Sequence, residues 1–181
     1  MISKNYETLM TRIFEGRLKV NYGQAYVESS EHRGVGLEES FCGQINGLCG
    51  AAYPGSLFLI TGLHTGYVGF TLDVLDTPPS LDDVWEEIVE VSFKPKLRKI
   101  IMFNWDGEKV CDIPLLPKTY RVRYCARNME LGSEVDSIVE EEPVDFYALM
   151  FWQGDLAPDV VVKQTSPVAA GWHNWARTLK F

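Results

Sequence analysis

Alternation of apolar and polar side chains is the dominant pattern along this chain, and it predicts β-strands. In the segment 119–127, Tyr120, Val122 and Tyr124 alternate with arginines, which is the two-residue period of a strand with one buried face. The same period recurs in short segments separated by turn residues. We expect strands at residues 18–22 with 25–27, 57–60, 67–75, 85–93, 99–105, 109–113, 119–127, 146–152 and 160–163.

Glycine and proline residues mark the connections between these strands. Residues 62–66, which hold two glycines between apolar runs, predict one hairpin, and Asp106 with Gly107 predicts another. Residues 29–55 are rich in glycine and predict a long connection with one short strand at most. Gly23 and Gln24 interrupt an apolar run where we expect a bulge.

Two segments have the spacing of helices. Ser166 before Pro167 predicts an N-cap followed by the first residue of a C-terminal helix. The apolar residues of this helix share one face: Val168, Trp172, Trp175 and Leu179. Residues 5–15 fit a short N-terminal helix, but residues 11–20 also fit a strand, and the pattern leaves both open.

Together these elements predict a mainly β fold, an antiparallel β-sandwich of jelly-roll-like layout with a short C-terminal helix. We expect residues 1–181 to form a single β-rich domain, because 181 residues is an ordinary domain length. Apolar residues make up 46% and charged residues 23% of the chain, as in soluble globular proteins. No apolar run approaches the roughly 20 residues that span a bilayer, and the first residues lack the apolar core of a signal peptide. We therefore expect a cytoplasmic protein that does not bind a membrane.

The cysteines give no sign of a metal or redox centre. Cys42, Cys49, Cys111 and Cys125 form no C-x-x-C motif, and no histidine follows them at zinc-finger spacing. Reduced thiols without a metal or cofactor are the simplest interpretation, and a disulfide between Cys42 and Cys49 or a metal site is the alternative.

Negative charge is concentrated in one stretch of the chain. The protein has 25 acidic and 17 basic residues, and no lysine or arginine lies between Asn128 and Lys163. This stretch contains nine acids: Glu130, Glu134, Asp136, Glu140, Glu141, Glu142, Asp145, Asp155 and Asp159. The rest of the chain is therefore close to neutral, with 16 acidic and 17 basic residues. Such a segment repels nucleic acid and attracts basic proteins.

The acidic stretch is the first candidate for a binding surface. We expect a loop at residues 131–145 whose carboxylates contact a basic partner: Glu134, Asp136, Glu140, Glu141, Glu142 and Asp145. The competing interpretation is a loop that is only solvated.

An arginine stripe is the second candidate. Arg121, Arg123 and Arg127 share one face of a strand, and with His64 they offer a pocket for a small anionic ligand. Cross-strand pairing of these arginines with Glu86 and Glu90 is the interpretation we favour. No nucleophile elbow, phosphate-binding loop or dinucleotide motif is present, so the sequence favours a non-enzymatic protein over an enzyme.

Two strand patterns resemble a known family. Residues 18–27, Leu-Lys-Val-Asn-Tyr-Gly-Gln-Ala-Tyr-Val, are similar to the opening strand of the competence protein J family. Residues 110–114 and 118–122 resemble that family's strand, proline-containing turn and tyrosine-led strand. This chain is longer, with a glycine-rich insertion at residues 34–55 and an added helix after Ser166. The resemblance implies inhibition of a nuclease.

The leading hypothesis is therefore a binding protein of the inhibitor or immunity type that uses its acidic surface against a basic partner such as a nuclease. A ligand-binding or enzymatic β-sandwich with a pocket near Arg121, Arg123 and His64 is the first alternative. A structural subunit of an oligomer is the second.

Overall fold

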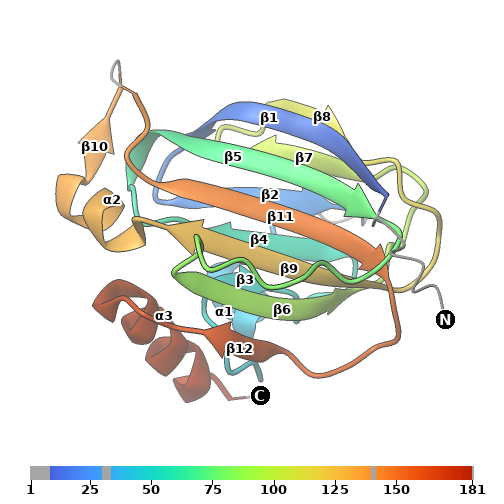
Figure 1. The fold of residues 1–181 in the computed structure, drawn as a ribbon. Helices are drawn as coiled ribbons and strands as arrows, with labels where there is room; N and C mark the ends of the chain where they lie inside the picture. Colours follow the sequence, from blue (N-terminus) through green and yellow to red (C-terminus); the bar gives the residue numbers. More distant parts are fainter. Residues whose placement is uncertain (1–8, 30–33, 140–141, 181) are drawn as a thin grey trace, which may run out of the picture.

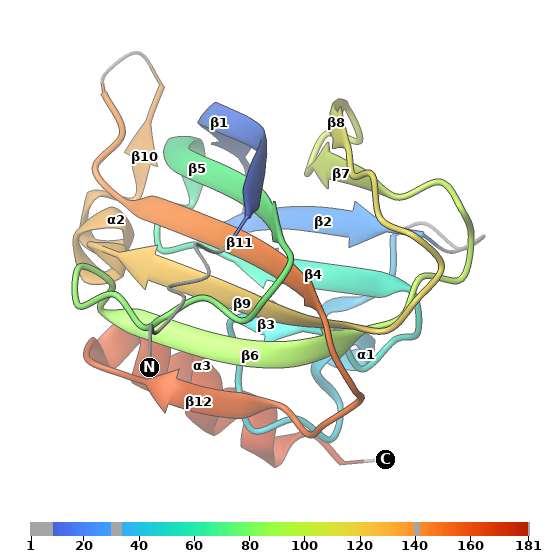
Figure 2. The ribbon, with the colours of Figure 1, turned by 45° about the vertical axis from the view of Figure 1, so that its right-hand side comes forward.

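Two β-sheets face each other and enclose the core (Figures 1 and 2). The computed structural model describes residues 9–29, 34–139 and 142–180. Sheet A has the strand order β1-β5-β11-β9-β6-β12, with β10 also paired to β5, and sheet B has the order β3-β4-β2-β7-β8. The strands are β1 (Met10–Val20), β2 (Gln24–Glu28), β3 (Cys49–Gly50), β4 (Ser56–Ile60), β5 (Thr65–Leu75), β6 (Glu87–Phe93), β7 (Ile101–Asn104), β8 (Lys109–Asp112), β9 (Tyr120–Arg127), β10 (Ser137–Ile138), β11 (Phe146–Gln153) and β12 (Val160–Lys163). The helices are α1 (Leu37–Phe41), α2 (Met129–Val135) and α3 (Pro167–Thr178).

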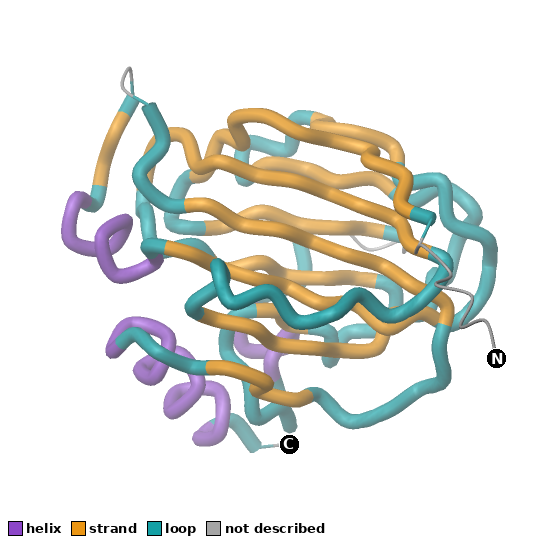
Figure 3. Tube along the Cα trace, in the orientation of Figure 1, coloured by secondary structure: helices purple, strands orange, loops and turns teal. Residues whose placement is uncertain are grey.

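The prediction of a mainly β, sandwich-like fold with a short C-terminal helix is confirmed. Sheet B is antiparallel throughout, but sheet A is mixed, because β11 and β10 both run parallel to β5. β11 lies between β5 and β9, and the connection from β5 to β6 crosses the outer face of sheet A to reach the far side of β9 (Figure 3). Alternation of side chains defines which face of a strand is buried, but it does not define the order of strands, so this parallel pair could not be predicted from the alternation.

Apolar side chains from both sheets meet in one core. Val122 and Tyr124 of β9 point into it, as the alternation predicts, and so do Val68, Phe70 and Leu72 of β5. β4 is buried along its whole length because α1 covers one of its faces. The ring of Phe41 on α1 lies 5.9 Å from Phe58 of β4 and 5.6 Å from Trp175 of α3, measured between ring centroids. Aromatic contacts therefore join both helices to sheet B.

The N-terminal segment is a strand where it is described. β1 covers residues 10–20 and pairs with β5 along its length, with an irregularity between Arg12 and Phe14. The helical alternative for residues 5–15 is therefore wrong from Met10 onward, and residues 5–8 lie outside the described residues. Pairing with a long central strand decides between two patterns that local spacing left open.

Two glycine signals have a different meaning from the predicted one. Residues 62–66 do not form a hairpin, because β4 belongs to sheet B and β5 to sheet A. A Cβ at Gly62 would collide with the carbonyl oxygen of Met129, and one at Gly66 with that of Ile138. These glycines allow close backbone contact with the segment after β9. Similarly, Gly23 is not at a bulge but in the tight turn where the chain passes from sheet A to sheet B.

Other predicted turns and caps are confirmed. Asp106 and Gly107 connect β7 and β8, which pair antiparallel, and Gly107 has the left-handed φ of +80° that this turn favours. The Ser166 side chain accepts a hydrogen bond from the Ala169 amide at 3.2 Å and caps α3. The predicted loop at 131–145 instead contains the end of α2 and β10. The seven residues of α2 show no clear helical pattern in the sequence, because Gly132 and acidic residues interrupt it.

His173 fixes α3 against the connection that leads to β3. Its Nδ1 accepts a hydrogen bond from the Gly47 amide at 3.0 Å, and its side chain is 1% exposed. Burial lowers the pKa of this histidine to about 4. Folding therefore requires the neutral ring, and the unfolded chain takes up a proton near pH 6.5 that the folded protein takes up only near pH 4.

We predict that acid destabilises the protein through His173. Between pH 7 and pH 5 this residue alone should remove about 2 kcal/mol from the free energy of unfolding. Urea denaturation of the wild type and of His173→Asn, which retains an acceptor for the Gly47 amide, measures the effect. The difference in stability between the two proteins should shrink by that amount as the pH falls. A difference that does not vary with pH would contradict the assignment.

Candidate binding surface at one end of the sandwich

Four connections meet at one end of the sandwich, on the left of Figure 1. They are the β1–β2 turn, the β4–β5 connection, the β7–β8 hairpin and the chain between α2 and β10. Backbone hydrogen bonds join three of them: the Gly23 amide donates to the His64 carbonyl at 2.9 Å, and the His64 amide donates to the Asp136 carbonyl at 2.9 Å. The side chain of Thr65 also donates to Asn21 at 3.0 Å. This end of the protein is therefore held in one arrangement.

Three aromatic rings are exposed together on this end. Tyr22 is 56% exposed and Trp105 is 40% exposed, and their ring centroids lie 5.1 Å apart. The exposed ring of His64 lies 5.0 Å from Tyr22 in an edge-to-face contact. Large aromatic side chains on a rigid surface are the residues that contribute most to protein–protein binding. The three rings form a compact apolar centre for such an interface.

Tyr22 has an unusual backbone conformation. Its φ is +54°, in the left-handed region that a bulky residue occupies at a cost of roughly 1–2 kcal/mol. The following residue, Gly23, is also left-handed, and a Cβ there would lie 2.9 Å from the Thr61 carbonyl oxygen. The turn thus forces the tyrosine ring outward, and conformational strain of this kind concentrates at functional sites.

Acidic side chains border the three rings. Asp106 and Glu108 lie in the hairpin that carries Trp105. Asp136 follows α2, and its carbonyl oxygen accepts the hydrogen bond from the His64 amide. Asp106 forms an exposed ion pair with Lys19 at 2.8 Å. We define the turn-end surface by seven exposed residues: Tyr22, His64, Trp105, Asp106, Glu108, Glu134 and Asp136.

Only part of the predicted acidic surface is on the outside. Glu134, Asp136 and Glu142 are exposed, whereas Glu140 and Glu141 lie outside the described residues. Asp145 is 0% exposed, so its inclusion in a partner surface is wrong. One of its oxygens accepts from the Tyr147 hydroxyl at 2.6 Å and from the Leu63 amide at 3.0 Å.

The position of Asp145 has a physical explanation. Burial raises the pKa of its carboxyl group, and the two hydrogen bonds partly oppose that change. A Cβ at Gly132 would collide with this carboxylate, so α2 lies directly against it. Asp145 therefore fixes the α2 segment to the start of β11. In a sequence, a buried acid of this kind is indistinguishable from its exposed neighbours.

Two further acids of the stretch also act inside the structure. Glu130 accepts a hydrogen bond from the Val168 amide at 2.8 Å, at the N-terminus of α3, where a negative charge is favourable. Asp159 accepts from the Ile45 and Asn46 amides at 2.9 and 2.8 Å. The high acid content of the stretch thus has two causes, internal hydrogen bonding and surface charge.

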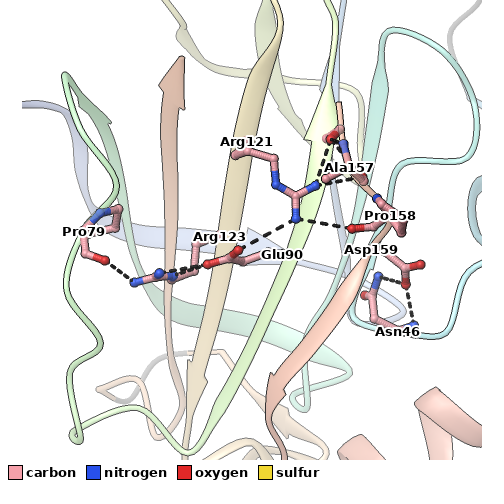
Figure 4. Close-up of polar contacts among 9 residues, drawn as sticks. Asn46, Pro79, Glu90, Arg121, Arg123, Ala157, Pro158 and Asp159 are labelled. Carbon is pink, nitrogen blue, oxygen red and sulfur yellow. Dashed lines mark hydrogen bonds and ion pairs between the residues drawn. The ribbon is translucent and has the colours of Figure 1, made fainter. Parts of the chain in front are cut away.

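Two arginines of the stripe, Arg121 and Arg123, pair across the strands as favoured, and their partner is Glu90. Arg123 donates to Glu90 at 2.8 and 2.9 Å, and Arg121 lies 3.8 Å from the same carboxylate (Figure 4). Arg121 also donates to the Ala157 carbonyl at 2.9 Å, and Arg123 to the Pro79 carbonyl at 2.9 Å. Both arginines are buried as a result, at 8% and 7% exposure.

The predicted pocket of Arg121, Arg123 and His64 is therefore wrong. The two arginines pair with Glu90 and donate hydrogen bonds to backbone carbonyls, while His64 contacts Tyr22 and Thr65. The other expected partner, Glu86, instead accepts a hydrogen bond from the Asn128 amide at 2.9 Å. Arg127 remains apart from this network, with its guanidinium over the ring of Phe146.

Sequence reasoning missed the aromatic half of the turn-end surface. Tyr22 ends the predicted strand at 18–22, where its alternation with Lys19 and Asn21 predicts an inward side chain, and Trp105 ends the predicted strand at 99–105. The signals were present in the neighbouring residues, since Gly23 follows one ring and Asp106 with Gly107 follows the other. An aromatic residue directly before a tight turn is more exposed than the strand period implies.

No metal or membrane feature appears in the part of the chain that the structure describes. Within residues 9–29, 34–139 and 142–180, His, Cys, Asp and Glu side chains do not gather in groups of three that could hold a metal ion. None of the described helices has the length and apolar character needed to cross a membrane. All four cysteines are free, and Cys49 and Cys125 are buried.

We predict that loss of Glu90 strongly destabilises the fold. Glu90→Ala leaves two buried guanidinium groups without their carboxylate and should lower the free energy of unfolding by about 3 kcal/mol. Denaturant titration measures this change, and Asp155→Asn, a neutralisation at an exposed position, is the matched control with an expected effect below about 0.5 kcal/mol. Equal stabilities of the two variants would show that the pairing contributes nothing.

The fold has recognisable counterparts among solved structures. No protein-family model and no curated protein sequence matches the chain. In three dimensions it is similar to ComJ from Bacillus subtilis, an inhibitor of the DNA-degrading activity of NucA, with a TM-score of 0.54 and 13% identity over 81% of this chain and 99% of ComJ. It is also similar to the protein called crocagin biosynthetic gene J, with a TM-score of 0.50 and 12% identity over 81% of this chain and 99% of that one. At such identities the similarity shows a shared fold, and the chain therefore has the fold of the competence protein J family that its strand patterns resemble.

Proposed function

We propose that this protein is a non-enzymatic inhibitor that binds a basic nuclease through the turn-end surface. The observation that carries the proposal is the cluster of Tyr22, His64 and Trp105, exposed together and bordered by carboxylates on a rigid end of the sandwich. The fold similarity to ComJ supports the choice of an inhibitor, since ComJ inhibits the DNA-degrading activity of NucA.

The charge of the turn-end surface favours a nuclease as the partner. Proteins that bind the DNA backbone carry lysine and arginine side chains that neutralise phosphates. Carboxylates at Asp106, Glu108, Glu134 and Asp136 attract the same groups and speed association at low salt. A bound inhibitor then occupies the position of the DNA backbone and prevents its cleavage.

Aromatic and acidic residues have separate roles in this interface. The rings of Tyr22 and Trp105 supply apolar area that a partner can bury, and such side chains contribute about 2 kcal/mol or more each when they are central to an interface. Exposed carboxylates contribute mainly to the rate of association and to its dependence on salt. Because backbone hydrogen bonds already fix the turns, little conformational entropy is lost on binding.

The test is capture of a nuclease from a lysate of the source organism, at low and at moderate salt. We expect the wild type to capture a DNA-degrading protein more efficiently at low salt and to inhibit its activity on DNA. Tyr22→Ala with Trp105→Ala should reduce affinity at least about 100-fold. The matched control, Leu116→Ala with Leu156→Ala, removes two exposed apolar side chains elsewhere and should leave capture unchanged.

Tyr22→Gly separates binding from folding. Glycine occupies the left-handed conformation without the steric cost, so this variant should be as stable as the wild type or about 1 kcal/mol more stable. Thermal unfolding measures the stability, and inhibition of the captured nuclease measures binding, which should fall. Capture of no nuclease, or equal inhibition by wild type and the aromatic double variant, would refute the proposed function.

A further inference from the structure

A groove crosses the outer face of sheet A, away from the turn-end surface. Its floor is formed by β1, β5 and β11, and its volume is about 470 Å³, within the range of small-molecule sites. One wall is formed by Val84 and Trp85, from the connection that crosses the sheet, and another by Glu142 and Pro143. A Cβ at Gly69 would collide with the ring of Phe146, so this ring lies over bare backbone and forms part of the groove lining.

Arg127 gives the groove a positive charge that no carboxylate of the described residues neutralises. Its guanidinium lies 4.6 Å from the centroid of the Phe146 ring, a stacking contact that holds the side chain in place. Its Nε is buried and has no hydrogen-bond acceptor, and no carboxylate of residues 9–29, 34–139 or 142–180 forms an ion pair with it. Arg121 and Arg123, on the same face of the same strand, are both fully engaged by Glu90 and by carbonyl groups.

This contrast indicates a ligand. A half-buried guanidinium without an acceptor is costly, because a desolvated donor loses its hydrogen bonds to water and gains none in return. Arg12, which also lines the groove, is already held by Asp73 at 2.8 Å and by Glu15 at 2.7 Å. Arg17, the third arginine of the groove, has its guanidinium 4.6 Å from the centroid of the Tyr67 ring. Arg127 is the arginine of the groove with a buried Nε that lacks an acceptor, so it is the group that we expect an anion to bind.

The surroundings of Arg127 select the kind of anion. Glu15 and Glu142 also line the groove and oppose a doubly charged group such as a phosphate. A carboxylate carries a single charge and matches the planar guanidinium. The sides of the groove are largely apolar, with Trp85, Val84 and Phe146 available to a flat hydrocarbon body. We propose that this groove binds a small aromatic carboxylate, whose carboxylate pairs with Arg127 and whose ring lies against Trp85.

The test is an amide NMR titration of the full-length protein with benzoate. Saturable shifts should appear at residues 84–85, 127 and 142–146, with a dissociation constant on the order of 1 mM or tighter. Benzamide, which has the same shape without the charge, and phenyl phosphate, which is a dianion near neutral pH, should each bind at least about tenfold more weakly. Wild-type spectra without saturable shifts at these residues, or with equal shifts from benzamide, would overturn the proposal.

Variants of Arg127 show whether the guanidinium is responsible. Arg127→Gln should weaken benzoate binding at least about tenfold, and Arg177→Gln, an exposed arginine on α3, should leave it unchanged. Arg127→Lys keeps the charge without the planar fork and should retain the fold if the glutamine variant does not. Benzoate binding equal to wild type in a folded Arg127 variant would also overturn the proposal. None of these measurements involves a nuclease, so the outcome is independent of the proposed function.

Discussion

The carboxylate of Glu90, paired with two arginines, holds two long connections against sheet A. It lies between Arg121 and Arg123. Arg123 also donates to carbonyl groups at residues 79–80, and Arg121 donates to carbonyl groups at residues 157–158, so each arginine joins Glu90 to a long connection. Those connections bring β6 and β12 to their positions at the side of the sheet. These three side chains thus hold two connections that have little regular structure. Their contribution to the stability of the protein depends on all three being present, because loss of one leaves the others buried and unpaired.

The acidic stretch shows how one chemical group has two uses. Asp145, Glu130 and Asp159 accept hydrogen bonds from backbone amides of distant segments, and this links β11, α3 and the turn before β3 to their neighbours. Glu134 and Asp136 are exposed, and the Asp136 carbonyl accepts a hydrogen bond from the His64 amide. The net charge of the protein therefore overstates the acidity of its surface. An electrostatic argument based on composition alone would place too much of that charge in contact with a partner.

Strands such as β5 and β9 were predictable because they follow a two-residue period, and the C-terminal helix because Ser166 and Pro167 mark its start. The pairing of β5 with β11 was not predictable, since partners such as Gly69 and Phe146 are 77 residues apart and both patterns fit either direction. Within the candidate surface, the period of the strand assigned Tyr22 to the core, but a left-handed turn rotates its ring outward. The cross-strand role of Arg121 and Arg123 was predictable from the alternation, because the acids of a neighbouring strand have the same period.

The central position of β11 also determines when the fold can be completed. β11 fills the gap between β5 and β9, so neither strand has both its neighbours until residues 146–153 are present. During synthesis, most of the chain must therefore leave the ribosome before sheet A can close, and the strand edges on either side of the gap remain available to other chains until then. Long-range pairing of this kind also slows folding, because the loop must close before its contacts contribute. Because β11 belongs to the last quarter of the sequence, sheet A reaches its native pairing only after that part of the chain has been made.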